Sequence, residues 1–361
     1  MNQPVTLSVG GRFFQHDRIF SSDPRQIRDQ ANAGFVRLRD AALQIGIALA
    51  TEDIHPPNDS KVVIDLNAQK WKAVTRRVPI RYLITIEPPV VYPNNWFQPE
   101  HLKYDKIFTW DDSLIDNKRY FLLRYAHNLG VEPGLPSFED RKLAATIIGF
   151  KSASHLQEQY SERFELIRWF LENHPKEFAL YGAGWPRHFR PPGPRRIEQF
   201  FSRPLDILLG SFYPVNLCYL GPVADKIKTF SQYRFAFCYE NTASAMGYIT
   251  EKIFDAFRAG CVPVYLGPPN VNEHIPDDCF IDRRQFSSHE QLYVRLKSME
   301  GAEFLAYQER IYEYLKSPQA HQFTPAHFAT VLLNHMSADL GLATTSDAGE
   351  CESNTALSPA S

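Results

Sequence analysis

The stretch 234-RFAFCYENTASAMGYITEKIFDAFRAGCVPVYLG-267 decides the fold. Residues 234–240 form an apolar run typical of a strand, residues 250–259 carry apolar side chains at helical spacing, and residues 262–267 form a second apolar run. A strand, a helix and a strand in this order predict a βαβ unit with parallel strands.

Outward from this unit, the same alternation of strands and helices continues in both directions. Further buried strands are predicted at residues 62–66 (VVIDL), 82–86 (YLITI), 107–110 and 146–150 (TIIGF). Amphipathic helices are predicted at residues 27–46, 156–173, 288–297, 303–316 and 325–340. The pattern predicts an α/β protein of two lobes, each built on a parallel sheet, with a cleft between them.

Length and composition agree with two domains. A chain of 361 residues is longer than one hydrophobic core usually serves. We predict an N-terminal domain at residues 1–141 and a C-terminal domain at residues 142–336. Residues 337–361 are rich in Ser, Thr and Ala without periodicity, so we predict that they are disordered.

The charge balance excludes partners that are attracted by a general electrostatic field. Lys and Arg number 39 against 41 for Asp and Glu, which gives a formal net charge of -2. We therefore expect no binding to nucleic acid, and an anionic ligand must be held by a local site.

The five cysteines are odd in number, scattered and without a C-x-x-C pair, which argues against a disulfide framework or a zinc site. Cys238 and Cys261 lie in apolar runs and are expected to be buried as small hydrophobic residues. The sequence contains neither a signal-peptide pattern nor an apolar run of about 18 residues. We expect a cytoplasmic protein, with peripheral association at the inner membrane and the oligomeric state left open.

Both strands of the βαβ unit end in polar or glycine residues. Glu240 and Asn241 follow the first strand and Gly267 follows the second. In an open parallel sheet, ligands bind beyond the carboxyl ends of the strands and opposite helix N-termini. The two strand ends therefore predict one binding crevice.

The first turn of the intervening helix carries a charge that its position does not favour. Thr250 is a plausible N-cap, followed by Glu251 and Lys252. Glu251 suits the positive end of the helix dipole, so dipole compensation explains it as well as ligand binding does. Lys252 opposes the dipole, which favours an anionic partner such as a diphosphate over a solvated surface lysine.

Motifs that would indicate other enzymes are absent from the sequence. No P-loop, complete G-x-G-x-x-G, H-E-x-x-H or G-x-S-x-G occurs. There is also no D-x-D pair to hold a divalent ion on a sugar diphosphate. We therefore expect no metal ligands and no required cofactor, with side chains and helix ends holding the diphosphate instead.

The run E-N, followed by Y-I-T-E-K and A-G-x-V-P-V-x-L-G, resembles the donor-binding signature of the α-1,3/α-1,4 fucosyltransferase family, glycosyltransferase family 10, in its bacterial soluble form. The resemblance extends through LAATIIGFKS, YSERFELIRWF and HIPDDCFIDRRQF, and covers about residues 8 to 335. It implies a GT-B fold with two Rossmann-like domains. It also implies that the C-terminal domain binds GDP-fucose and that the N-terminal domain binds most of the acceptor glycan.

The resemblance also implies roles for individual residues. Lys252 and Arg163 would bind the donor pyrophosphate, Glu251 would bind ribose or sugar hydroxyls, and Asn241 and Tyr248 would line the same pocket. Two alternatives stay open on the residues alone. Arg163 shares its predicted helix with Arg168 and could be a surface arginine. Tyr248 could stack on a base or ribose, or could be a half-buried aromatic residue.

Glu87 is the expected general base, because family members have a glutamate after a similar strand. This sequence departs from better-known bacterial members by following the glutamate with Pro88 and Pro89, which would stiffen the acceptor loop. The alternative for Glu87 is a solvated acid at a strand end.

The expected activity is inverting transfer of L-fucose from GDP-fucose to an acceptor hydroxyl. Two other functions remain open. One is a GT-B transferase with a different nucleotide sugar, since no local feature identifies fucose. The other is a catalytically silent protein that binds nucleotide or glycan.

Overall fold

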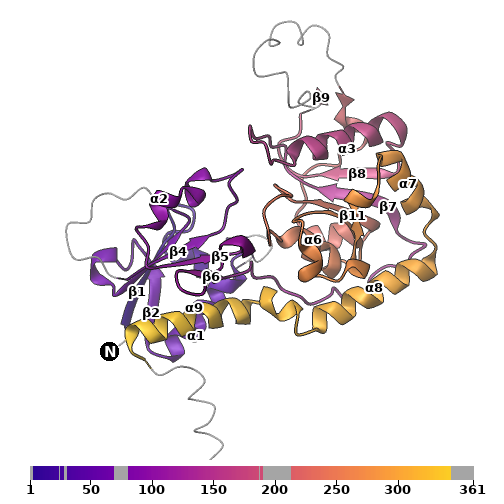
Figure 1. Cartoon of the computed structure of the whole chain (residues 1–361). Coiled ribbons are helices and arrows are strands. Elements are labelled where there is room, and N and C mark those ends of the chain that lie inside the picture. The colour runs from indigo at the N-terminus through magenta and orange to yellow at the C-terminus, as the bar shows by residue number, and fades with distance from the viewer. Residues whose placement is uncertain are drawn as a thin grey trace, which may run out of the picture. The chain divides into compact units, whose positions relative to one another are not determined.

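Two parallel sheets organise the chain, and each belongs to its own unit. The computed structural model describes residues 3–23, 25–27, 31–68, 80–186, 188–189 and 213–342. The chain divides into a first unit, Met1–Asn128 with Gln322–Ser361, and a second unit, Leu129–His321 (Figure 1).

The sheet of the first unit has six strands in the order β2-β1-β3-β4-β5-β6, and every pair is parallel. Its strands are β1 Gln3–Ser8, β2 Ile47–Thr51, β3 Val62–Leu66, β4 Ile80–Thr85, β5 Lys106–Thr109 and β6 Tyr120–Leu122. Its α-helices are α1 Ala33–Gln44, α2 Gln98–His101 and α9 Pro325–Leu340.

The sheet of the second unit has five strands in the order β13-β12-β11-β7-β8, and these pairs are parallel too. Its strands are β7 Lys142–Ile147, β8 Phe178–Tyr181, β11 Tyr233–Tyr239, β12 Val262–Leu266 and β13 Ile281–Asp282. Its α-helices are α3 Tyr160–Asn173, α5 Lys226–Phe230, α6 Glu251–Arg258, α7 His289–Ser298 and α8 Gly301–Lys316. A short antiparallel pair, β9 His188–Phe189 and β10 Tyr213–Pro214, accompanies the sheet.

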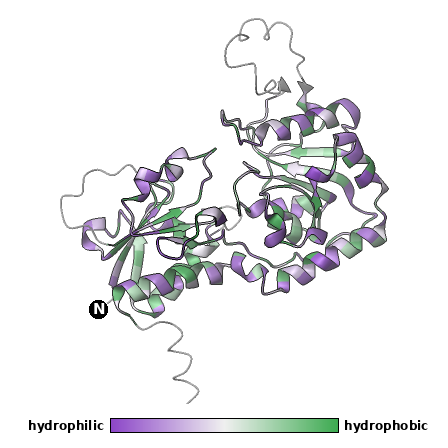
Figure 2. Cartoon of the chain, viewed as in Figure 1, coloured by the Kyte–Doolittle hydropathy of each residue, from purple (hydrophilic) through white to green (hydrophobic). Residues whose placement is uncertain are grey.

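Burial on both faces explains why the strands consist of nearly continuous apolar runs. All five residues of β3 and of β12 are buried, as expected for parallel strands that are covered on both sides. Figure 2 shows the hydrophobic colour concentrated in the sheets, with hydrophilic residues on the outer sides of the helices. Asp65, the one charged residue of β3, forms an ion pair of 2.9 Å with Arg81 of β4, which offsets its burial.

The predicted elements are present, with small shifts at their ends. The βαβ unit is β11, α6 and β12, and its strands are parallel as predicted. The helix predicted at residues 325–340 is α9, with the same bounds. The helix predicted at residues 156–173 begins later, at Tyr160, and the strand predicted at residues 146–150 is β7, which begins earlier, at Lys142.

The assignment of α9 to the C-terminal domain was wrong. Phe328, Leu332 and Met336 of α9 are buried in the core of the first unit. The ring of Phe328 lies 5.1 Å from that of Phe35 in α1. An apolar helix face packs equally well on either sheet, so its spacing does not reveal which sheet it covers.

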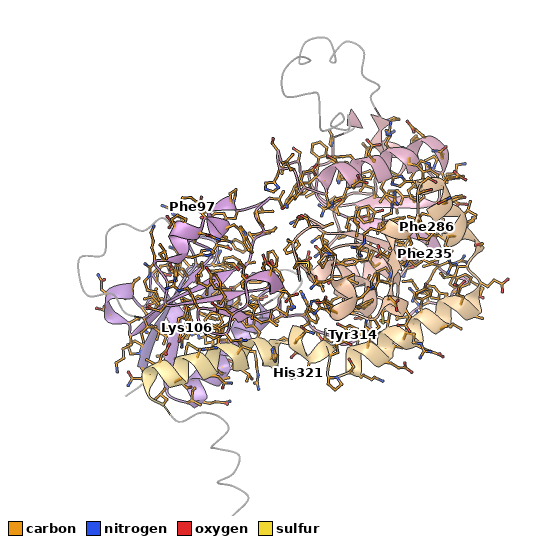
Figure 3. The ribbon with its side chains drawn as sticks, viewed as in Figure 1. Phe97, Lys106, Phe235, Phe286, Tyr314 and His321 are labelled. Atoms are coloured by element: carbon orange, nitrogen blue, oxygen red, sulfur yellow. The ribbon has the colours of Figure 1, made fainter. Side chains whose placement is uncertain are left out.

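Polar contacts hold the end of α9 against the first sheet. Lys106 of β5, labelled in Figure 3, forms an ion pair of 2.7 Å with Asp339 near the end of α9. Residues 337–340, predicted to begin a disordered tail, are therefore the last turn of this helix. Residues 343–361 of that predicted tail lie outside the described residues.

The contact between α1 and α9 predicts energetic coupling between Phe35 and Phe328. In a double-mutant cycle with Phe35→Leu and Phe328→Leu, each single variant already loses the contact between the two rings. The loss of unfolding free energy in the double variant should therefore be smaller than the sum of the two single losses, by about 0.5–1.5 kcal/mol. Urea denaturation measures this. As a control, Phe35→Leu combined with Phe304→Leu in α8 should be additive to within about 0.5 kcal/mol. Additivity of the first pair would contradict the packing of α9 on the first unit.

Candidate active site

The order of strands in the second sheet places a binding edge between β7 and β11. The chain runs from β7 to β8 on one side and later returns to β11 on the other side of β7. Such a reversal opens a crevice at the carboxyl ends of the strands. The segments that follow the two strands adjoin there, since Glu158 bridges Thr242 and the Gln159 amide donates to the Asn241 carbonyl at 2.9 Å.

Arg163 of α3 points into this edge and is buried. The relative exposure of Arg163 is 6%. Its Nη2 donates to the Tyr239 carbonyl at 2.6 Å and to Asn241 Oδ1 at 3.0 Å. Arg168 in the same helix has a side chain that is 40% exposed and pairs with Glu165. The surface-arginine alternative is therefore wrong for Arg163 and describes Arg168 instead.

The charge of Arg163 has no carboxylate beside it. Among the described residues, no acidic group lies within ion-pair distance of its guanidinium, and its buried Nε has no hydrogen-bond partner. Burial lowers the pKa of Arg163, while Tyr160 and the acids Glu240 and Glu251 oppose that shift from a longer range. A buried cation without a paired anion is costly, so an anionic ligand would fit here.

Asn241 and Tyr248 form the wall next to Arg163. Asn241 Nδ2 donates to the Tyr248 hydroxyl at 3.2 Å while its Oδ1 accepts from Arg163. Tyr248 is only 2% exposed. In this structure its ring is therefore a buried aromatic group, and its hydroxyl fixes the orientation of the Asn241 amide.

Lys252 has an anionic partner within the chain, and that partner is Glu240. The Lys252 Nζ lies 2.8 Å from Glu240 Oε2, 2.8 Å from Thr250 Oγ1 and 3.5 Å from Glu251 Oε1. Burial alone would lower the pKa of Lys252, but the two carboxylates more than offset it and the pKa lies above its ordinary value. The anion that balances the Lys252 ammonium within the chain is thus the carboxylate of Glu240, to which the sequence analysis gave no role.

Thr250 occupies the N-cap of α6 but does not cap it with its side chain. Its hydroxyl contacts Glu240 instead, at 2.8 Å from Oε2. The amides of the first turn therefore receive no side-chain cap from this residue, and helix N-terminal amides attract anions. Glu251 begins the helix with a side chain that is 46% exposed, as suits the dipole.

Glu87 belongs to the first unit and follows β4. Asn67 Oδ1 accepts from its amide at 3.1 Å, and its carbonyl accepts from Asn95 Nδ2 at 3.1 Å and from Trp96 Nε1 at 3.0 Å. The side chain is partly exposed. The backbone of Glu87 is therefore held firmly at the carboxyl edge of the first sheet.

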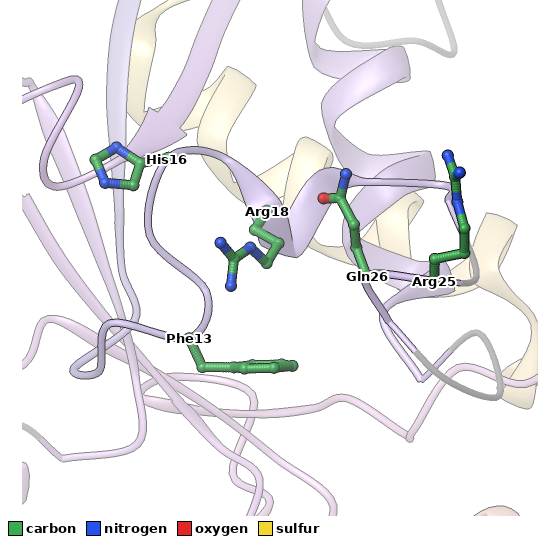
Figure 4. Close-up of a pocket in the computed structure, with 5 residues that line it drawn as sticks. All are labelled: Phe13, His16, Arg18, Arg25 and Gln26. Atoms are coloured by element: carbon green, nitrogen blue, oxygen red, sulfur yellow. The ribbon is translucent and has the colours of Figure 1, made fainter.

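A pocket of about 460 Å³ lies in the loop after β1, near the point where the first sheet reverses its strand order (Figure 4). Its lining residues are Phe13, His16, Arg18, Arg25 and Gln26. Phe13 is 57% exposed, and the guanidinium carbon of Arg18 lies 5.9 Å from the centre of its ring. The loop lacks periodicity, so no sequence signal singled it out.

Acidic neighbours compensate two of the basic groups in this pocket. Arg25 pairs with Asp23 at 2.8 Å, and His16 Nδ1 lies 2.9 Å from Asp53. Arg18 forms no ion pair with any residue that the structure describes. The pocket thus combines an exposed aromatic face with polar groups, one of which is a guanidinium that can bind an external acceptor.

The cysteines agree with the sequence analysis. Cys238 and Cys261 are free and buried, as are Cys218 and Cys279. Helices in the described part of the chain all lack the combination of length and apolarity that crossing a bilayer requires.

Comparison with solved structures identifies the architecture. A crystal structure of an alpha1,3-fucosyltransferase with GDP superposes with a TM-score of 0.54, at 13% identity, over 94% of this chain and 91% of that chain. An alpha-glucosyltransferase in complex with UDP-glucose and DNA gives a TM-score of 0.52, at 10% identity, over 94% and 99%. These likenesses show the fold alone, and the fold is GT-B.

Sequence comparison relates part of the chain to one family of glycosyltransferases. The family model for the C-terminal part of glycosyltransferase family 10 (fucosyltransferase) matches residues 221–328. An alpha-(1,4)-fucosyltransferase of Arabidopsis thaliana is 39% identical over 79 residues, which are 22% of this chain and 19% of that protein. The alpha-(1,3)-fucosyltransferase FucT of Helicobacter pylori is 33% identical over 91 residues, which are 25% and 19%. The chain therefore spans about a fifth of the length of these relatives.

The part of the chain that resembles glycosyltransferase family 10, the fucosyltransferase family, is residues 221–328. The matched residues include Asn241, Tyr248, Glu251 and Lys252. Arg163 and Glu87 lie outside them, so their roles rest on geometry and on resemblance.

The buried charge of Arg163 predicts that the protein binds inorganic pyrophosphate. A concentration of about one hundred times the dissociation constant should raise the free energy of unfolding by about 2.7 kcal/mol. Arg163→Met should abolish this gain, because it removes the cation and keeps most of the side-chain volume. Thermal denaturation with and without pyrophosphate measures the effect. Arg168→Met is the matched control and should keep the gain; equal losses in both variants would contradict an anion site at Arg163.

Proposed function

We propose that this protein is an inverting fucosyltransferase that transfers L-fucose from GDP-fucose to a hydroxyl group of an acceptor glycan. The observation that carries the proposal is the buried, carboxylate-free guanidinium of Arg163 beside the N-terminus of α6, in a chain whose residues 221–328 match the fucosyltransferase family. A donor diphosphate supplies the anion that such a site lacks.

On the donor side, Arg163 and Lys252 bind the pyrophosphate and stabilise the charge that grows as GDP departs. An arginine stays protonated throughout the accessible pH range, and fixed cations need no rearrangement at the transition state. Asn241 and Tyr248 hold the guanidinium of Arg163 in place, since Asn241 links the two. Glu251 accepts hydrogen bonds from ribose or sugar hydroxyls through its exposed carboxylate.

On the acceptor side, Glu87 removes the proton from the attacking hydroxyl. A general base of this kind contributes about a hundred- to ten-thousand-fold to the rate. Inversion follows when the hydroxyl attacks the anomeric carbon on the face opposite to the departing GDP. The hydrogen bonds to the backbone of Glu87 support a fixed position for this base.

The pocket in the loop after β1 is our candidate for binding the acceptor sugars. An aromatic ring such as that of Phe13 packs on the apolar face of a sugar ring, and Arg18 and Gln26 donate hydrogen bonds to hydroxyl groups.

Glu87→Gln should abolish transfer but keep GDP binding, because the amide cannot accept the proton while the donor unit is unchanged. Transfer is measured as GDP release from GDP-fucose with a panel of galactose- and N-acetylglucosamine-containing oligosaccharides, and binding by calorimetry. We expect a rate loss of about a hundredfold or more.

Glu100→Gln in α2 makes the same chemical change in the same unit and should leave the rate near that of the wild type. Transfer by Glu87→Gln at a normal rate would assign the base to another residue. Nucleotide release from UDP-glucose but not from GDP-fucose would replace the proposed donor. GDP binding by the wild type without transfer of any sugar would indicate a catalytically silent homologue.

Phe13→Ala and Arg18→Gln should raise the KM for the best acceptor of that panel, because each removes a contact with the sugar. The expected rise is roughly tenfold for the loss of one good contact, and the dissociation constant of GDP should stay the same. Leu43→Ala, which truncates an exposed residue of α1, is the control. An unchanged KM in both pocket variants would place the acceptor elsewhere.

A further inference from the structure

Glu240 is the most enclosed charged group of the second unit's binding edge. It follows β11, the central strand of that sheet, and its relative exposure is 0%. A carboxylate in such a place is tolerated only when hydrogen bonds and a cation compensate it. The structure supplies both from the two elements that follow β11 in the chain.

Four donor groups converge on the Glu240 carboxylate. Oε1 accepts from the Thr250 amide at 2.9 Å and from the Tyr265 hydroxyl at 3.1 Å. Oε2 accepts from the Thr250 hydroxyl and from Lys252 Nζ, both at 2.8 Å. These contacts tie the end of β11 to the start of α6 and to β12.

The position of Tyr265 depends on a glycine. A Cβ at Gly267 would lie 2.4 Å from the Tyr265 ring and its hydroxyl oxygen, so no larger residue fits at this position without displacing the ring. Gly267 thereby allows Tyr265 to reach Glu240. A glycine at position 267 therefore serves the packing of Tyr265 against the buried Glu240, in addition to leaving room for a ligand at the strand end.

The charges around Lys252 make Glu240 decisive for its protonation. The charged groups that act on Lys252 are the carboxylates of Glu240 and Glu251 and the guanidinium of Arg163 in α3. Two further ionisable groups lie nearby. The Cys238 thiol in β11 donates to the Lys252 carbonyl at 3.1 Å, and the Tyr265 hydroxyl in β12 donates to Glu240 at 3.1 Å. Burial and Arg163 favour the neutral amine. Glu240 favours the ammonium and is the closest carboxylate, at 2.8 Å against 3.5 Å for Glu251.

We propose that Glu240 is a positioning residue of the donor site, whose buried carboxylate keeps Lys252 protonated and fixed against the first turn of α6, so that the ammonium and Arg163 face the donor diphosphate together. This inference rests on the proposed function, because it assumes that a diphosphate binds there. Glu240 has a relative exposure of 0%, so its role is to position Lys252 and not to contact the substrate.

A carboxylate next to a diphosphate site weakens diphosphate binding, and a residue with a purely structural role would not require that negative charge. Its negative charge repels the phosphates, so a neutral hydrogen-bond acceptor would hold Thr250 and Tyr265 without this penalty. The charge is explained when its task is to keep a second, partly buried cation, Lys252, ionised beside Arg163. The removal of that charge therefore has opposite effects on GDP binding at low and at high pH.

The test is the pH dependence of GDP binding to the full chain, measured by calorimetry between pH 6.5 and 9.5. In the wild type the pKa of Lys252 is raised, so the ammonium stays charged throughout this range. In Glu240→Gln, burial and Arg163 should bring the pKa down into the range. The variant should bind GDP as well as the wild type or better at pH 6.5, and should lose affinity as the pH rises. The ratio of its dissociation constant to that of the wild type should increase about tenfold or more between the two pH values.

Two further variants separate charge from structure. Tyr265→Phe removes a hydrogen bond to Glu240 but keeps the carboxylate, so its ratio should not change with pH. Glu240→Gln combined with Lys252→Arg should lose the new pH dependence, since a guanidinium does not titrate below pH about 12. GDP ionises in the same way in the experiments with the wild type and with each variant, so its ionisation cancels in the ratio of the two dissociation constants. Should Glu240→Gln fail to fold, Glu240→Asp should show a smaller ratio change of the same sign, because the shorter side chain keeps the charge but lengthens the contact.

Different results would contradict the role of Glu240 and the proposed function. A ratio that is constant with pH in Glu240→Gln, or in Glu240→Asp when the former does not fold, would overturn the role of Glu240 while leaving the donor site intact. Absence of GDP binding by the wild type would overturn the proposed function, and the inference would fall with it.

Discussion

One buried cation, Arg163, and one partly buried cation, Lys252, lie at the carboxyl edge of one parallel sheet, and the second unit is built around the need to compensate them. Arg163 and Lys252 come from different helices and meet near the end of β11. The positive charge of Lys252 is balanced by the carboxylate of Glu240. Arg163 has only neutral acceptors among the described residues, namely the Tyr239 carbonyl and Asn241 Oδ1. The imbalance leaves one positive charge for a ligand, and under the proposed function that ligand is the donor diphosphate.

Topology puts these groups together. Because β7 and β11 are neighbours in the sheet but are separated by β8 in the sequence, the segments after them face one another across the point where the strand order reverses. The short helix α6 then directs its N-terminus to the same edge. The first unit repeats this logic, with the loop after β1 and Glu87 after β4 both at the carboxyl edge of its sheet. This arrangement fits the proposed function, in which the second unit holds the donor and the first unit holds the acceptor.

Periodicity was sufficient to predict the βαβ unit and α9, because each has a single apolar pattern bounded by clear end signals. It could not assign α9 to a unit, since a buried helix face is chemically the same on either sheet. The position of Lys252 in the first helical turn indicated an anionic partner, but a helix dipole attracts a carboxylate of the chain and a ligand alike, and Glu240 is that partner here. The sequence placed Glu240 at the predicted crevice but did not reveal its role, which depends on contacts with Thr250 and Tyr265, ten and twenty-five residues away in the sequence. The pocket at Phe13 lies in a loop, where no periodicity exists to be detected.

The central claim is that the positive charge at the end of β11 binds the diphosphate of a nucleotide sugar. The most direct measurement is a crystal structure of the full chain with GDP bound. The account predicts phosphate oxygens within roughly 3.2 Å of the Arg163 guanidinium and the Lys252 ammonium, with the Lys252–Glu240 contact preserved. A diphosphate bound away from both cations, or an Arg163 that pairs with a carboxylate of the protein instead, would contradict it.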